Sequence, residues 1–144
     1  MKAKELMIGD WVQIIEPCKY AGAIGRIKTL IDHKDEENAY FKVFLQNNTK
    51  HIGIEDICSE DIRPIPLTPE ILEKNGFIRD MFYGEWQFDL DPFPFSVVQR
   101  ENNSWYLGRE EYGIAHNREI IDISHVHELQ HAIRLCGIEK EIEL

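Results

Sequence analysis

Short β-rich segments separated by turn residues fill the first 64 residues, and this pattern most constrains the fold. Four such segments occupy residues 11–15, 24–30, 40–45 and 51–54, with glycine, proline or asparagine between them. In 24–30 apolar and polar residues alternate, as in a strand with one buried face. Four or five short strands at this close spacing are typical of a small β-barrel.

Two stretches of this region resemble a known motif. Residues 9–12 (GDWV) and 20–27 (YAGAIGRI) are similar to the KOW-type motif of SH3-like barrels, although Cys18-Lys19 replaces a glycine of that motif. The resemblance implies that a strand, a glycine-containing loop and a second strand open an SH3-like β-barrel. Such barrels bind RNA, proteins or no known ligand, so the resemblance bears on the fold and leaves the function open.

A different pattern follows the proline-marked connection at 60–67 (EDIRPIPL). Thr68 as N-cap, Pro69 at the first helical position and Gly76 after the last turn predict a short helix. Further strands are predicted at 81–83, 85–88, 95–99, 104–107 and 118–122, and a last helix at 124–136. We therefore expect an α+β fold: an SH3-like barrel in 1–64, then a helix–antiparallel meander–helix module in 65–144.

Residues 65–68 (IPLT), residues 71–77 (ILEKNGF) and the start of the last helix at 126–130 (VHELQ) are also distinctive. Through them the whole chain resembles a group of small uncharacterised proteins from gut anaerobic bacteria and their phages. That group has no assigned activity. The resemblance implies the architecture and a phage or mobile-element origin, and it supplies no catalytic residues.

Charge is distributed unevenly along an acidic chain. The chain has 16 Lys and Arg against 26 Asp and Glu, a net charge of -10. Residues 1–64 carry 9 basic against 11 acidic side chains, whereas residues 65–144 carry 7 against 15. Because phosphate binding needs clustered basic residues, this disfavours nucleic acid strongly for the second module and less for the first.

Cysteine spacing and hydropathy bear on the compartment. Cys18, Cys58 and Cys136 form no CxxC pair, so neither a disulfide framework nor a cysteine zinc site is indicated. Met1 to Leu6 has no signal-peptide character, and no apolar run reaches the length of a membrane span. We expect a cytoplasmic protein with no membrane partner. Its oligomeric state is left open.

The last helix contains a literal HExxH sequence, His127-Glu128-Leu129-Gln130-His131. In zinc peptidases two histidines one helical turn apart bind Zn²⁺, and the glutamate acts as general base. A zinc-dependent hydrolase that uses His127, His131 and Glu128 is therefore one alternative.

Two features argue against this zinc alternative. The metzincin pattern needs Gly at 134 and His at 137, where the chain has Arg134 and Gly137. The helical phase of the apolar residues also places both histidines on a flank away from the core, which predicts a solvated polar face. This second feature favours a chain with no metal and no catalytic residue.

Basic and aromatic residues near the KOW-like loop form a second candidate site. Lys19, Arg26 and Lys28 are close in sequence to Trp11 and Tyr20, a combination found in weak nucleic-acid binding sites. The alternative is that Trp11 is a core residue and the basic side chains are solvated.

A stiff loop in the second module is a candidate contact for a protein partner. Residues 91–95 (DPFPF) combine two prolines with Phe93 and Phe95, and one ring is expected to be exposed. The preferred hypothesis is a non-enzymatic protein-interaction or adaptor protein that needs no cofactor. The zinc hydrolase and weak nucleic-acid binding through the barrel are the alternatives.

Overall fold

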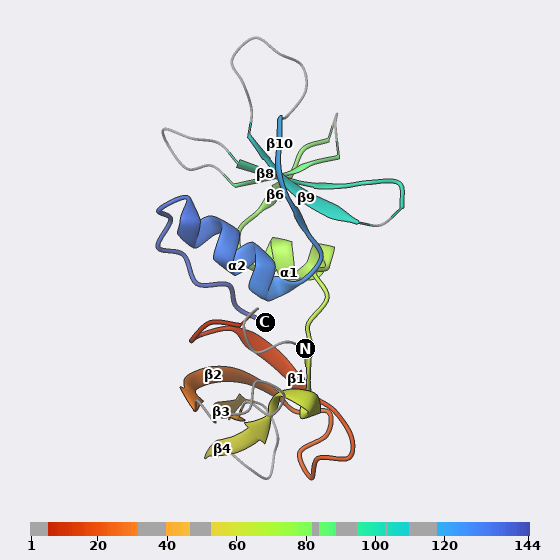
Figure 1. Ribbon diagram of the computed structural model, residues 1–144. Coiled ribbons are helices and arrows are strands. Elements are labelled where there is room, and N and C mark those ends of the chain that lie inside the picture. Colours follow the sequence, from red (N-terminus) through yellow and green to blue (C-terminus); the bar gives the residue numbers. More distant parts are fainter. Residues whose placement is uncertain are drawn as a thin grey trace. The chain divides into compact units, whose positions relative to one another are not determined.

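A computed structural model of the chain describes residues 6–31, 40–46, 53–81, 84–88, 95–102, 104–109 and 118–144. The chain divides into two compact units, Met1–Ile65 and Pro66–Leu144. The division falls within the proline-marked connection. Figure 1 shows the elements of both units along the chain.

The described part of the first unit is an antiparallel sheet of five strands in the order β4-β3-β2-β1-β5. Their bounds are β1 (Trp11–Ile14), β2 (Ile24–Ile31), β3 (Tyr40–Gln46), β4 (Gly53–Cys58) and β5 (Ile62–Pro64). A 3₁₀ turn at Ser59–Asp61 links the last two strands. The strands curl around a shared interior and form a barrel-like sheet (Figure 1).

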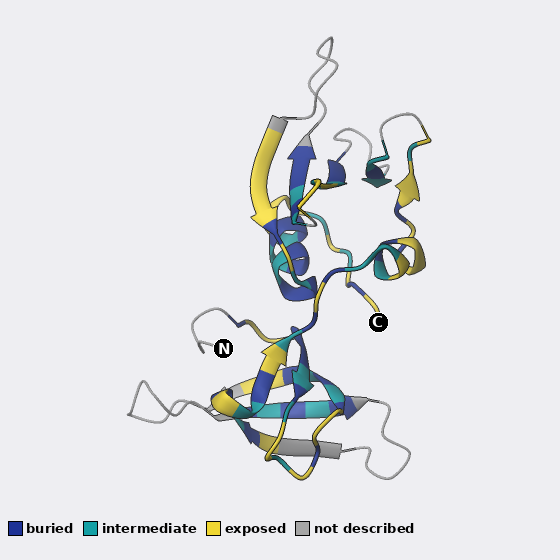
Figure 2. Ribbon diagram, turned by 90° about the vertical axis from the view of Figure 1, so that its right-hand side faces the viewer, coloured by how far each residue is buried: buried dark blue, intermediate teal, exposed yellow. Residues whose placement is uncertain are grey.

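Alternation of side chains builds the core of this sheet. Phe41, Val43 and Leu45 of β3 are buried, and the residues between them are partly exposed. Dark blue and lighter segments accordingly alternate along the strands in Figure 2. The buried residues that pack together are Leu6, Val12, Ile14, Tyr20, Ala23, Ile27, Phe41, Val43, Leu45, Ile57 and Ile62. Each fully buried aliphatic side chain contributes about 1.5–3 kcal/mol to folding.

Gly25 lets β2 and β3 approach closely. A β-carbon at this position would lie 2.5 Å from Cγ1 of Val43 and 2.8 Å from the carbonyl oxygen of Phe44. The register of the two strands shifts between Ile27 and Thr29, which marks a β-bulge. The strict alternation expected for 24–30 is therefore interrupted at Lys28.

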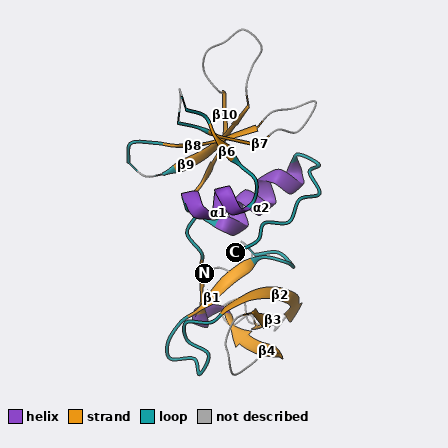
Figure 3. Cartoon of the chain, turned by 180° about the vertical axis from the view of Figure 1, so that it is seen from behind, coloured by secondary structure: helices purple, strands orange, loops and turns teal. Residues whose placement is uncertain are grey.

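The described part of the second unit is an antiparallel sheet in the order β10-β9-β8-β7-β6, with two helices (Figure 3). The bounds are α1 (Pro69–Lys74), β6 (Ile78–Arg79), β7 (Trp86–Phe88), β8 (Phe95–Gln99), β9 (Trp105–Arg109), β10 (Arg118–Ile123) and α2 (Val126–Leu135). Leu67 donates its N–H to the carbonyl of Ser124 over 2.9 Å, which ties the residues before α1 to those before α2.

The capping residues of α1 act as the sequence predicts. Thr68 accepts a hydrogen bond from the Ile71 amide at 3.5 Å, and Pro69 fills the first helical position. Asn75 follows the last helical residue, and Gly76 has a φ of 79°. The predicted start and end of this helix are confirmed.

The expected α+β class is wrong. In the described ranges the chain is mostly β: ten strands form two antiparallel sheets, and the two helices have only 6 and 10 residues. The second unit is therefore a five-stranded sheet with short helices, and not a helix–meander–helix module. The capping residues mark both ends of α1 correctly, but a helix of 6 residues adds little to the helical content of the chain.

We predict that Gly25→Ala destabilises the first unit by about 1–3 kcal/mol, the usual cost of adding a methyl group to a packed sheet. Gly22→Ala is the matched control, because no atom lies within 4 Å of its added β-carbon although its φ is 86°. We expect the control to cost about 1 kcal/mol, from backbone strain alone. Urea unfolding with hydrogen exchange of the β2 amides measures both; an equal loss in the two variants would contradict the steric argument.

Candidate functional site

The outer side of the first sheet gathers basic side chains from three strands. Arg26 and Lys28 come from β2, Lys42 from β3 and Arg63 from β5, and we call this surface the cationic face. Their backbone partners define the side: Arg26 is opposite Trp11 and Phe44, and Arg63 is opposite Gln13. Arg26, Lys42 and Arg63 alternate with buried positions, so their side follows from the strand register. Lys28 lies in the β-bulge of β2 and is placed on this side by its contact with the ring of Phe44.

Two of these cations lie over aromatic rings. The Cζ of Arg26 lies 4.5 Å from the ring centroid of Trp11, and the Nζ of Lys28 lies 5.6 Å from that of Phe44. Cation–π contacts of this kind contribute about 0.5–1 kcal/mol at exposed sites. Trp11 is 5% exposed, so its ring is covered and offers no free surface for a nucleic-acid base.

Polar contacts orient the other two cations. Lys42 forms an ion pair with Asp56 at 3.1 Å, and both side chains are about half exposed. Such a surface pair contributes about 0–1 kcal/mol to stability. Arg63 donates from Nε to Oε1 of Gln13 at 2.9 Å. Asp56 is thus an acidic side chain that pairs with a cation of this face.

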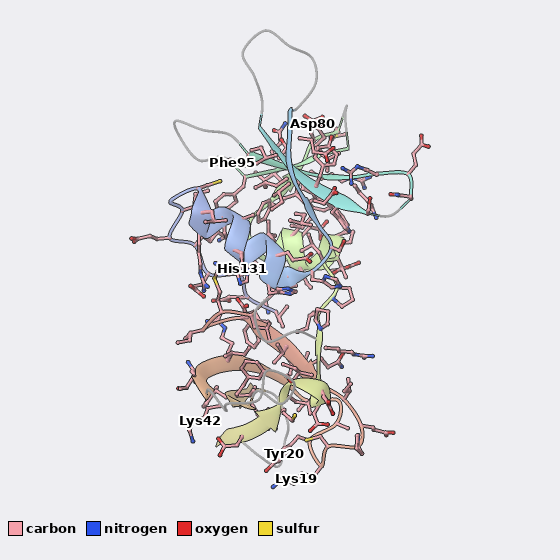
Figure 4. The ribbon with its side chains drawn as sticks, viewed as in Figure 1. Lys19, Tyr20, Lys42, Asp80, Phe95 and His131 are labelled. Carbon is pink, nitrogen blue, oxygen red and sulfur yellow. The ribbon has the colours of Figure 1, made fainter. Side chains whose placement is uncertain are left out.

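The remaining barrel residues singled out in the sequence lie on the loop before β2. Tyr20 is 6% exposed and belongs to the core, and the Nζ of Lys19 lies 4.4 Å from the centroid of its ring. Figure 4 shows these two residues away from Lys42 on β3. The structure therefore brings Arg26 and Lys28 together on the sheet and leaves Lys19 on the loop.

Lys42 and Arg63 complete the face, and the sequence reasoning missed both. For Lys42 the signal was present: it alternates with the apolar residues of β3 and must therefore point outward. Arg63 stands in a three-residue strand that ends at Pro64, and a strand this short shows no alternation.

The phenylalanine loop does not supply the expected exposed ring at Phe95. This residue begins β8, pairs with Phe88 of β7 and is 8% exposed. Phe93 lies outside the described residues.

The glutamate of the HExxH sequence caps the helix that contains it. Oε2 of Glu128 accepts hydrogen bonds from the backbone N–H groups of Ser124 at 2.6 Å and His125 at 2.9 Å. The same oxygen lies 3.2 Å from Nδ1 of His125. The carboxylate is thus turned back over the first turn of α2, where helical N–H groups lack intrahelical partners.

These contacts set the ionisation of Glu128. Partial burial opposes its charged form, but the hydrogen bonds from Ser124 and His125 and the charge of His125 outweigh it, so the pKa of Glu128 is lowered from 4.5. A general base for metal-bound water needs an oxygen directed at that water. In α2 the carboxylate is directed at the start of its own helix.

One of the two HExxH histidines, His127, is buried, whereas His131 is partly exposed. His127 is 5% exposed, and its ring centroid lies 5.7 Å from that of His125 and 5.6 Å from that of His131. The expected polar flank is therefore wrong at His127. Within the described ranges, no group of three or more His, Cys, Asp or Glu side chains is arranged to hold a metal ion.

Comparison with known proteins identifies no relative: no family model, no curated protein and no solved structure matches the chain. The KOW-like motif and the likeness to proteins of gut anaerobes and their phages therefore stay predictions. Neither helix in the part of the chain that the structure describes is long and apolar enough to cross a membrane.

We predict that Glu128→Gln lowers the free energy of unfolding of the second unit at neutral pH. The expected loss is about 0.5–1 kcal/mol, the range for a partly screened charge at a helix N-terminus. Because the folded-state pKa of Glu128 is lowered from 4.5, its contribution is present above that pH and is lost as the pH falls through the folded-state value.

The gap between wild type and Glu128→Gln should therefore close in acid. Thermal unfolding from pH 7 to pH 3 measures it, with Glu101→Gln in an exposed turn as control. A peptidase activity lost in Glu128→Gln at unchanged stability would contradict the capping role.

Proposed function

We propose that the chain is a non-enzymatic protein-interaction module that binds an acidic surface of a partner protein through the cationic face. The observation that carries this proposal is that Arg26, Lys28, Lys42 and Arg63 all lie on the outer side of one sheet, in a chain of net charge -10. Charge complementarity of this kind steers association and selects partners.

A protein partner is favoured over nucleic acid by the state of the aromatic rings. Single-stranded nucleic acid binds through bases that stack on accessible rings together with a basic groove. Here Trp11 and Tyr20 are buried, and each has a cation of the chain over its ring.

An interaction role is favoured over hydrolysis by the position of Glu128. Its carboxylate caps α2 through Ser124 and His125, and this use competes with general-base catalysis. The described contacts of Glu128, which a zinc hydrolase would use as general base, therefore do not support that alternative.

Binding of two defined probes tests the proposal. We expect immobilised full-length protein to bind poly-L-glutamate at about 50 mM salt and to lose most of this binding at about 500 mM, as screening requires. The double variant Lys28→Glu/Arg63→Glu should bind about tenfold more weakly, because it reverses two exposed charges. Arg79→Glu, at an exposed cation of the second unit, is the matched control and should bind as wild type does.

Single-stranded polyuridylate serves as the second probe. Tighter binding of this RNA than of polyglutamate, lost in the same double variant, would favour the nucleic-acid alternative. Absence of binding to either probe at low salt would overturn the proposal.

A further inference from the structure

Residues 138–144, which we call the strap, are held by side-chain amides from two helices of the second unit. Gln130 of α2 donates from Nε2 to the carbonyl of Lys140 at 2.7 Å and accepts from the amide of Ile142 at 2.6 Å. Asn75, which follows α1, donates to the carbonyl of Glu143 and accepts from its amide, both at 2.8 Å. Four backbone groups of the strap are thus satisfied by two side chains.

The contacts are buried and centre on one apolar side chain. Gln130 is 2% exposed and Asn75 is 5% exposed, while Ile142 is completely buried. Figure 2 shows the last residues of the chain running between α2 and α1. Contacts of this kind recognise an extended backbone and one aliphatic side chain, and most other side chains of the segment take no part in them.

One charged contact favours an acidic residue beside that aliphatic anchor, and a second holds the backbone. Arg134 of α2 forms an ion pair with Glu141 at 2.9 Å, next to the anchor in sequence. At the other end, Lys74 of α1 donates to the carbonyl oxygen of Leu144. The groove, defined by Asn75, Gln130, Arg134 and Lys74, therefore suits an extended segment with a carboxylate next to a branched aliphatic residue.

The strap meets α2 at a point where the backbone changes direction. Gly137 has a φ of 76°, and the Ile138 amide bonds back to the carbonyl of Ile133 at 3.0 Å, which ends the helix. A surface pocket of about 360 Å³ lies at this point and is lined by Arg134 and by residues 137–141. The base of the strap thus borders open space, and the strap begins at the last hydrogen bond that ends α2.

We propose that this groove is a peptide-binding site that takes, in trans, an extended segment of a partner protein with an acidic residue directly before a branched aliphatic residue. The strap occupies the site in cis and competes with the partner. Side-chain amides that pair with the N–H and C=O groups of an extended segment recognise any chain in that conformation. This site is separate from the cationic face and does not depend on the role proposed for it.

Competition in cis sets the condition for binding. A tethered segment acts at an effective concentration on the order of millimolar. A free peptide therefore binds well only when the strap is weakened. Substitution of Ile142 should weaken the strap, because its completely buried side chain is the one apolar anchor among residues 140–143.

The test uses the full-length chain and a fluorescein-labelled peptide with the sequence of residues 138–144, IEKEIEL. We expect Ile142→Ala protein to bind this peptide at least about tenfold more tightly than wild type, as measured by fluorescence anisotropy. Adding Gln130→Met, which keeps the side-chain volume but removes both backbone contacts, should weaken binding about tenfold. Gln99→Met, at an exposed position of β8, is the matched control.

Further measurements separate recognition from folding. Circular dichroism must show the same fold for the Ile142→Ala and Ile142→Ala/Gln130→Met proteins; if the second unfolds, a peptide with alanine at the position of Ile142 replaces it and should bind about tenfold more weakly. Equal peptide binding by wild type and Ile142→Ala would overturn the proposal. A concentration-dependent dimer that the peptide dissociates would place the occupant in a second copy and overturn the partner assignment.

Discussion

The register of β2 against its two neighbours determines what the first unit presents to its surroundings. Gly25 allows the close approach to Val43 and Phe44 that fixes this register. The same register places Arg26 between Trp11 and Phe44 on the outer side. Because successive side chains of a strand point to opposite faces, a slip of one residue would bury the cations and expose the core. Core packing and surface charge are thus two results of one constraint.

Backbone N–H and C=O groups of the second unit find hydrogen-bond partners in two ways. Within the sheet, strands pair directly, and the edge strand β10 carries a bulge between Glu119 and Ile121. Arg100 bridges Glu119 at 2.7 Å and Asp122 at 2.6 Å along that edge. Bulges and charges at an edge oppose pairing with another chain. The strap, in contrast, is bound by amide side chains away from this edge. We therefore expect another extended chain to bind in the groove between the helices and not at the edge strand.

Sequence reasoning succeeded where a local signal dictates a local structure. Thr68 and Pro69 mark the start of α1, and Gly76 marks its end. It failed where structure depends on distant partners. The two residues of β6 are both exposed and show no periodicity. Gln130 looks like an ordinary polar helix residue, and only the fold brings it to the backbone of Ile142.

The HExxH sequence shows how position within a helix decides the role of a side chain. α2 begins at Val126, so Glu128 stands in the first turn, where unpaired N–H groups and the helix dipole attract a carboxylate. The same residue further along a helix would have no such groups within reach and would be free to act on a ligand. The predicted start at residue 124 hid this distinction. With the glutamate committed to the helix start, the pentapeptide becomes part of the framework that holds Gln130 against the strap.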